Sequence, residues 1–226
     1  SSSVAHEINN PLSGILVYSK LLYKQVNQPE FTHPKKETML KNLKLIESET
    51  KRCGEIVKGL LDFSRKDRED FEHVDLHSIL KETCDLIGHR VKMSNIAFKK
   101  EFRAKKDRVF CSPNQIKQAC VALIVNATEA IRENGEIVIR TINPDDTHIQ
   151  ICISDSGTGI ADHDLPHIFE PFYSTKQEGN GIGLGLAIVH KTMRDHGGRA
   201  VIDTIPEQGT SIRLFFPAED TAGSES

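Results

Sequence analysis

The sequence has no tryptophan and little that would support a covalent or metal-held scaffold. Its five cysteines are odd in number and never spaced as Cys-x-x-Cys; they are Cys53, Cys84, Cys111, Cys120 and Cys152. This arrangement argues against a disulfide framework and against a zinc knuckle, and it favours a reducing compartment. We therefore expect each cysteine to behave as a small buried apolar residue.

Long apolar runs and a strong net charge are also absent. No apolar stretch approaches the ~20 residues of a transmembrane helix, and the first residues lack the pattern of a signal peptide. The 226 residues carry a formal net charge of -3, which excludes a strong general attraction to nucleic acid or to anionic membranes. We expect a cytoplasmic chain without membrane contact, and a fragment of a longer protein because a motif lies so near its first residue.

The first part of the chain predicts two long helices. Residues 4–27 repeat apolar side chains at helical spacing, with Pro11 inside the pattern, so a kink is expected there. Residues 35–65 repeat them in the same way, after a connection at 28–34. Two such helices form an antiparallel hairpin whose apolar seam one copy cannot cover. Two copies pairing into a four-helix bundle, and hence a homodimer, would cover it.

A charged segment then leads into a region of mixed helices and strands. The predicted domains are a helical hairpin at 1–66, a linker at 67–73, an α/β domain at 74–218 and a disordered tail at 219–226. Helices are expected at 76–91, capped by Asp75, at 112–134 and at 184–196. Strands are expected at 96–102, 108–111, 136–143, 147–154, 200–204 and 211–216. This order predicts an α/β sandwich in which helices cover one face of a mixed sheet.

A first glycine motif, Asp155-Ser156-Gly157-Thr158-Gly159, follows a predicted strand. The Asp155 carboxylate could accept a hydrogen bond from the amino group of adenine, and it would repel the carbonyl of guanine. Gly157 and Gly159 would let the backbone pass close to a flat base. Taken alone, the motif is equally typical of a β-turn.

A second glycine-rich loop, residues 179–186, runs directly into a predicted helix. Backbone amides around Gly181, Gly183 and Gly185 could hold phosphate oxygens, with the helix N-terminus behind them. The loop is not a Rossmann fingerprint, because polar residues precede it rather than a buried strand. It is not a Walker loop either, because Gly-Lys-Ser/Thr is missing.

Two further features suit a nucleotide site. Asn126 and Glu129 stand three residues apart, so they share a helix face, and their oxygens suit Mg²⁺ beside phosphate. For such a pair alone, a solvent-facing polar stripe is the commoner explanation. The segment Phe169–Lys176 offers aromatic anchors for a lid and places Lys176 to neutralise phosphate, although a loop plug with a solvated lysine has the same pattern.

These features stand in one order, and near the start of the chain lies His6-Glu7-x-x-Asn10-Pro11. Over essentially the whole chain, the set resembles the kinase core of a two-component sensor histidine kinase. The segment around His6 resembles the phosphoacceptor motif of the dimerisation helix. Residues 114–134 resemble the Asn-containing motif of the ATP-binding domain of the gyrase, heat-shock chaperone and histidine kinase superfamily. The two glycine motifs, the segment between them and Gly209-Thr210 resemble its other motifs.

The resemblance implies that His6 accepts the γ-phosphate of ATP and passes it to an aspartate on the receiver domain of a response regulator. Glu7 would orient or deprotonate the imidazole, and Asn10 would orient a water that dephosphorylates the regulator. Asn126 would bind Mg²⁺. The residues expected to bind ATP are Asn126, Glu129, Asp155, Gly157, Gly159, Lys176, Gly181, Gly183, Leu184, Gly185 and Thr210. Such a kinase core is either cytoplasmic or the cytosolic part of a membrane-tethered sensor.

One position departs from the family pattern and bears on the alternatives. Ala122 stands where family members commonly have a second Asn, and where related ATPases have a water-activating Glu. An ATPase or conformational clamp of the same superfamily would therefore lack its base. A scaffold that docks a regulator without chemistry would not need the glycine motifs. A phosphatase-dominant enzyme stays open, because Asn10 suits both directions. His163 and His167 have metal-ligand spacing, but surface or packing roles are expected for them.

Overall fold

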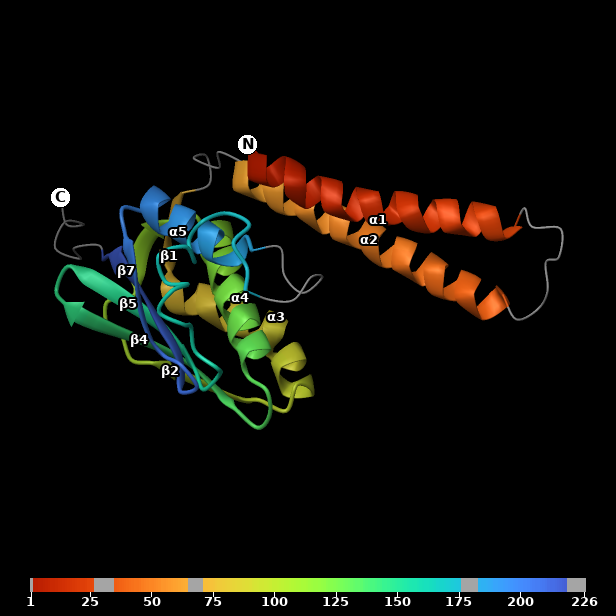
Figure 1. Ribbon diagram of the computed structural model, residues 1–226. Helices are drawn as coiled ribbons and strands as arrows, with labels where there is room; N and C mark the ends of the chain where they lie inside the picture. Colours follow the sequence, from red (N-terminus) through yellow and green to blue (C-terminus); the bar gives the residue numbers. More distant parts are fainter. Residues whose placement is uncertain (1, 27–34, 65–70, 176–182, 219–226) are drawn as a thin grey trace. The chain divides into compact units, whose positions relative to one another are not determined.

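The computed structural model describes residues 2–26, 35–64, 71–175 and 183–218 (Figure 1). They divide into two compact units, a helical one up to residue 64 and an α/β one from residue 71.

The first unit is a hairpin of α1 (Ser2–Val26) and α2 (Lys35–Ser64), which pack along each other. The helix α1 continues through Pro11, which is buried; the bend expected there stays a prediction. Ile56 of α2 is fully buried. Other apolar side chains of the expected seam are about half exposed, among them Leu12 at 49%, Leu16 at 55% and Leu43 at 51%. One copy of the hairpin thus leaves much of its apolar surface uncovered.

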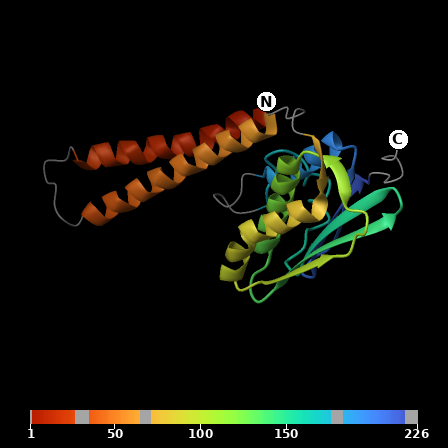
Figure 2. The same ribbon diagram turned by 180° about the vertical axis from the view of Figure 1, so that it is seen from behind.

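The second unit is built on a five-stranded sheet with the order β2-β4-β5-β7-β6. The strands are β2 (Ala97–Phe102), β4 (Glu136–Asp145), β5 (His148–Asp155), β6 (Arg199–Ile205) and β7 (Gly209–Pro217). Only β2 and β4 run parallel within this sheet, and its other pairs are antiparallel. The helices α3 (Leu76–Met93), α4 (Pro113–Ala130) and α5 (Gly185–Asp195) lie on one face of the sheet (Figures 1 and 2). The predicted mixed sheet with one helix-covered face is confirmed.

The core lies between this sheet face and the three helices. Alternate residues of the central strands point into it, among them Ile137 and Ile139 of β4 and Ile149 and Ile151 of β5, all fully buried. Each such side chain contributes about 1.5–3 kcal/mol by leaving water. Three of the five cysteines join this core, and burial raises the pKa of their thiols, for Cys84 to about 11. All five cysteines are free.

A small second sheet was only half expected. Arg108–Cys111 forms β3 as predicted, and its antiparallel partner is β1 (Glu72–Asp75). The sequence placed Glu72 and His73 in the linker, but they begin β1. Four residues with exposed or half-buried side chains carry little apolar periodicity, and only the pairing with β3 makes them a strand.

The helix α4 is shorter than predicted and ends at Ala130, not at Asn134. Asn134 has a positive φ of 49°, which a helix cannot contain. The N–H of Thr158 donates to the Ala130 carbonyl at 3.1 Å and so satisfies one of the helix's last acceptors from outside. The first glycine motif therefore meets the C-terminal end of α4.

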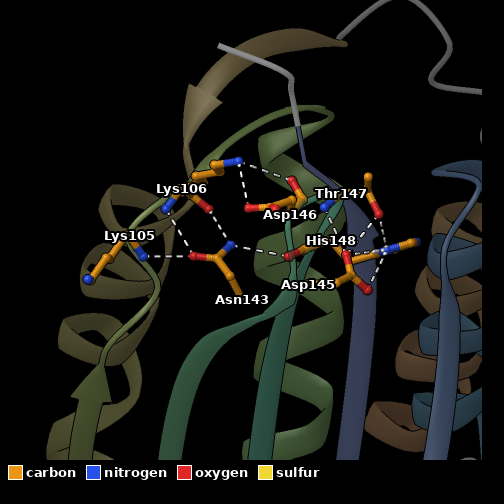
Figure 3. Close-up of polar contacts among 7 residues, drawn as sticks. All are labelled: Lys105, Lys106, Asn143, Asp145, Asp146, Thr147 and His148. Atoms are coloured by element: carbon orange, nitrogen blue, oxygen red, sulfur yellow. Dashed lines mark hydrogen bonds and ion pairs between the residues drawn. The ribbon is translucent and has the colours of Figure 1, made fainter. Parts of the chain in front are cut away.

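A polar clasp ties the loop between β2 and β3 to the turn between β4 and β5 (Figure 3). The side-chain oxygen of Asn143 accepts from the N–H groups of Lys105 and Lys106 at 2.8 and 3.0 Å. Its amide nitrogen donates to the carbonyls of Lys106 and His148 at 2.8 and 3.1 Å. A single half-buried amide thus satisfies four groups of two loops, and Lys106 adds an ion pair with Asp146 at 3.1 Å.

Candidate nucleotide-binding site

Asp155 is the last residue of β5, and its side chain is half-buried at the end of the strand. One of its oxygens accepts from the N–H of Gly157 at 2.8 Å. Burial raises the pKa of the Asp155 carboxyl, and the backbone N–H groups of Gly157 and Thr210 offset this rise only in part. The residue is thus a fixed acceptor in a partly dry environment.

Close backbone packing explains the glycines of this first motif. A Cβ on Gly157 would lie 2.7 Å from the Cβ of Ala130, so no side chain fits between the motif and the end of α4. Gly159 has a positive φ of 68°, and a Cβ there would collide with the carbonyl of Ile205. The motif is therefore a tight turn that also packs between the end of α4 and the end of β6. A β-turn and a nucleotide-binding loop, the two explanations offered by the sequence, are compatible with this one backbone.

The Gly209-Thr210 pair completes this end of the sheet. Thr210 is buried and stands opposite Asp155 in the pairing of β5 with β7. A Cβ on Gly209 would collide with the Asp155 carbonyl. Thr204 links the strands, because its hydroxyl lies 3.1 Å from the Thr210 hydroxyl and accepts the N–H of Ile160 at 2.9 Å. These contacts fix the position of Asp155.

Asn126 lies on α4 beside the beginning of α5. A Cβ on Gly185, the first residue of α5, would come within 3.3 Å of the Asn126 amide and 3.7 Å of the Ala122 methyl. The amides that open α5 therefore lie next to Asn126, with the buried Leu184 preceding them as N-cap. Among the residues that the structure describes, none makes a hydrogen bond to the Asn126 side chain. An amide oxygen so placed suits Mg²⁺, and the helix N-terminus suits phosphate.

The helix α4 thus connects the two glycine motifs. Gly157 touches Ala130 and Gly185 approaches Asn126, four residues earlier. Four helical residues span about 6 Å along the axis, so both motifs border one stretch of α4. Glu129 lies in this stretch, and one of its contacts is an ion pair with Arg90 of α3 at 3.8 Å. Its part in nucleotide binding stays a prediction.

The segment before the second glycine motif is anchored by its aromatic residues. The Phe169 ring lies 5.2 Å from the His190 ring on α5, and the Tyr173 hydroxyl donates to Asp164 at 2.5 Å. This bond to a carboxylate raises the pKa of Tyr173. The N–H of Phe172 donates to the Gly183 carbonyl at 2.9 Å, and a Cβ on Gly183 would lie 2.5 Å from the Phe172 backbone. Lys176 and Gly181 lie outside the described residues.

The other residues singled out from the sequence are found as follows. His6 and Glu7 belong to the first turns of α1, where the structure describes the backbone and not these side chains. Asn10 lies one turn further on with an exposed side chain. His163 and His167 are in turns, not in a helix, and each faces a carboxylate, that of Asp164 and Glu170 respectively.

Comparison with known proteins follows the same division of the chain. Residues 1–69 match the family model of the His Kinase A (phospho-acceptor) domain, and residues 111–220 match that of the histidine kinase-, DNA gyrase B- and HSP90-like ATPase. The catalytic domain of the histidine kinase ThkA is 31% identical, with a TM-score of 0.59 over 66% of this chain and 95% of that domain. The chain belongs to the two-component sensor histidine kinases.

Longer relatives extend the match to both units. The structure of ThkA in complex with the response regulator protein TrrA is 28% identical, with a TM-score of 0.71 over 96% of this chain and 60% of that one. Sporulation kinase E of Bacillus subtilis (strain 168) is 27% identical over 98% of this chain and 29% of its own length. Among eight curated relatives with this match, the chain spans between 24% and 46% of each one's length. Among the described helices, none is long and apolar enough to cross a membrane.

Sequence reasoning missed one group of ionisable side chains. Asp75, His77 and Asp107 meet where β1 passes into α3. Asp75-x-His77 alone carried no recognisable spacing, and Asp107 joins it only through the pairing of β1 with β3, which the sequence did not reveal. This group lies apart from the candidate nucleotide site.

Proposed function

We propose that the α/β unit of this sensor histidine kinase binds Mg-ATP and that the γ-phosphoryl group is transferred to His6. The observation that carries the proposal is the arrangement along α4, where Asn126 and the start of α5 lie within one helical turn of the Asp155 turn. That arrangement suits a nucleotide with its base at Asp155 and its phosphates at α5.

Base recognition falls to Asp155. One carboxylate oxygen would accept a hydrogen bond from the exocyclic amino group of adenine, while the N–H of Gly157 holds the other oxygen in place. Guanine presents a carbonyl at the same place, and two apposed acceptors would be left without a proton between them. The close approach of Gly209 to the Asp155 carbonyl fixes the backbone from which this side chain extends.

Phosphate binding falls to Asn126 and the first amides of α5. The amide oxygen of Asn126 would hold the Mg²⁺ ion, which neutralises phosphate charge when bound. The N-terminus of α5 adds backbone donors and the positive end of a helix dipole. Lys176 and the amide of Gly181 would add to this charge neutralisation, and Glu129 and Leu184 would border the nucleotide.

His6 is the proposed acceptor. A loose phosphoryl-transfer transition state needs alignment and charge neutralisation more than a strong base, and a neutral imidazole is nucleophilic at cytosolic pH. Glu7 would hold the proton on the other ring nitrogen. Since Ala122 stands where an ATPase needs an acid, a protein nucleophile is favoured over water.

We also propose a homodimer and a response-regulator partner. The hairpin exposes several large apolar side chains, with Leu12, Leu16, Leu21, Leu40 and Leu43 all between 44% and 55% exposed. A patch of this kind marks an interface, and a second hairpin would cover it. The ThkA structure contains a bound response regulator, and by likeness this chain would pass its phosphoryl group to a receiver aspartate. Asn10 could orient a water that later hydrolyses the phosphoaspartate to aspartate and inorganic phosphate.

The test is incorporation of labelled γ-phosphate by the purified chain. His6→Ala should lose all label while ATP still binds, because the acceptor and the nucleotide site lie in different units. His89→Ala, an exposed histidine on α3, is the matched control and should be labelled like the parent. Label retained by His6→Ala would refute the acceptor assignment. A scaffold would show no Mg-dependent ATP affinity, and an ATPase would release phosphate without labelling the protein.

A further inference from the structure

A compact group of metal-binding side chains lies at the start of α3, away from the proposed nucleotide site. Asp75, His77 and Asp107 each direct one ligand atom to a common point, and these atoms lie within 4.8 Å of one another. In the described part of the chain, no other group of three His, Cys, Asp or Glu side chains comes so close together.

The backbone brings the two carboxylates together. Asp75 is the last residue of β1 and the N-cap of α3, and one of its oxygens accepts from the N–H of Ser78 at 3.2 Å. Asp107 precedes β3, and its carbonyl accepts from the N–H of Leu76 at 2.9 Å. The pairing of β1 with β3 then sets Asp75 opposite Arg108. The two carboxyl groups are held close together, an arrangement that a cation between them would stabilise.

The imidazole of His77 is oriented from both sides. Its Nδ1 lies 2.9 Å from an Asp107 oxygen, and its Nε2 lies 2.8 Å from the Thr141 hydroxyl. The ring also stacks on Phe102, with centroids 5.2 Å apart and planes 14° apart. One nitrogen faces the carboxylates while the other is held by a polar neighbour, which is how metal-ligating histidines are usually positioned.

We propose that Asp75, His77 and Asp107 bind a divalent transition-metal ion, with Zn²⁺ the best fit. One imidazole and two carboxylates suit Zn²⁺, whereas Mg²⁺ prefers oxygen ligands alone. Ligand atoms of a tetrahedral zinc site are roughly 3.3 Å apart, from bonds of about 2.0 Å. The exposed Asp75 side chain can rotate to close the remaining gap, and its exposure leaves a fourth position for water.

Binding moves protons in a defined way. The metal takes the lone pair of Nδ1, so the bound ring carries its single proton on Nε2, facing the Thr141 hydroxyl oxygen. An imidazolium releases its Nδ1 proton to water on binding, and a neutral ring protonated on Nδ1 exchanges that proton to Nε2 through water. The metal would join the first turn of α3 to the loop before β3. Thr141 is four residues along β4 from Ile137, the partner of Asp155, so the metal site lies ~13 Å along the sheet from the adenine-binding carboxylate.

The test is equilibrium dialysis of the chelator-treated chain against Zn²⁺, together with its thermal unfolding. The parent should bind one Zn²⁺ with a rise in Tm, and His77→Gln and Asp107→Asn should each weaken binding at least about 10-fold and abolish the rise. The matched control is His148→Gln, which removes a histidine that also bonds a carboxylate, Asp145, and should bind as the parent does.

Equal Zn²⁺ binding by the parent, His77→Gln and Asp107→Asn would overturn the proposal, as would the absence of stoichiometric binding. If the variants fail to fold, Co²⁺ titration of the parent decides. A visible spectrum typical of nitrogen and oxygen ligands supports the site, and a thiolate charge-transfer band would assign the metal to a cysteine and refute it. ATP affinity enters none of these readouts, so this proposal and the proposed kinase function can fail separately.

Discussion

At the scale of single residues, Asp155 gives the sharpest prediction. Asp155→Asn keeps an oxygen for the Gly157 N–H but turns an NH₂ group toward the amino group of adenine, so two donors would meet. ATP affinity should fall roughly 10- to 100-fold, the value of a hydrogen bond to a charged group, while the Tm changes little. Asp203→Asn, which alters an exposed carboxylate of β6 paired with Arg213, is the control and should bind ATP normally. Unchanged ATP affinity in Asp155→Asn, measured by nucleotide titration, would show that the adenine ring binds elsewhere.

Positions that depend on local sequence were predictable, and neighbours that depend on strand pairing were not. Asp155 could be singled out from the glycines beside it, because the tight turn requires glycine at those positions whatever it packs against. Asp107 lies more than thirty residues from Asp75, and a pair of registered strands alone makes them neighbours. Ala122 shows the reverse case: its methyl group faces Gly185, as the missing second Asn would, so the departure lies in the site itself.

At the scale of elements, the β4–β5 turn makes a prediction about acid stability. Hydrogen bonds from Thr147 and His148 lower the pKa of Asp145 to about 2, well below the usual value for an aspartate (Figure 3). Because the folded-state pKa is the lower one, the ionised carboxylate stabilises the fold above pH ~4, and that contribution is lost as pH falls toward 2. Asp145→Asn should therefore have a lower Tm than the parent at pH 6, and the gap should shrink by pH 3. Asp146→Asn removes an equal charge at the neighbouring residue and should show no such trend. Equal behaviour of the two variants would contradict the assignment of the lowered pKa to Asp145.

Element types were predictable from periodicity, and element ends were decided by contacts. The alternation of isoleucines in β4 and β5 predicts both strands, since one face must be buried. The end of α4 was misplaced by four residues because Thr158, a distant residue, takes the Ala130 carbonyl and the chain turns at Asn134. The strand β1 has no periodicity of its own and exists because β3 offers a partner.

At the scale of the whole molecule, the exposed leucines of the hairpin predict a dimer. Leu16 and Leu43 are 55% and 51% exposed in a single chain, so lysine at either place should leave the hairpin folded. In a two-fold bundle each substitution buries two ammonium groups where two leucines packed, which should raise the dimer dissociation constant roughly 100-fold. Sedimentation velocity across a concentration series measures this shift. Leu86→Lys, at a 77% exposed leucine on α3, is the matched control and should leave the dimer intact. If the hairpin variants sediment as the parent does, these leucines do not pair the subunits, and the exposed apolar side chains of α1 and α2 bind another partner.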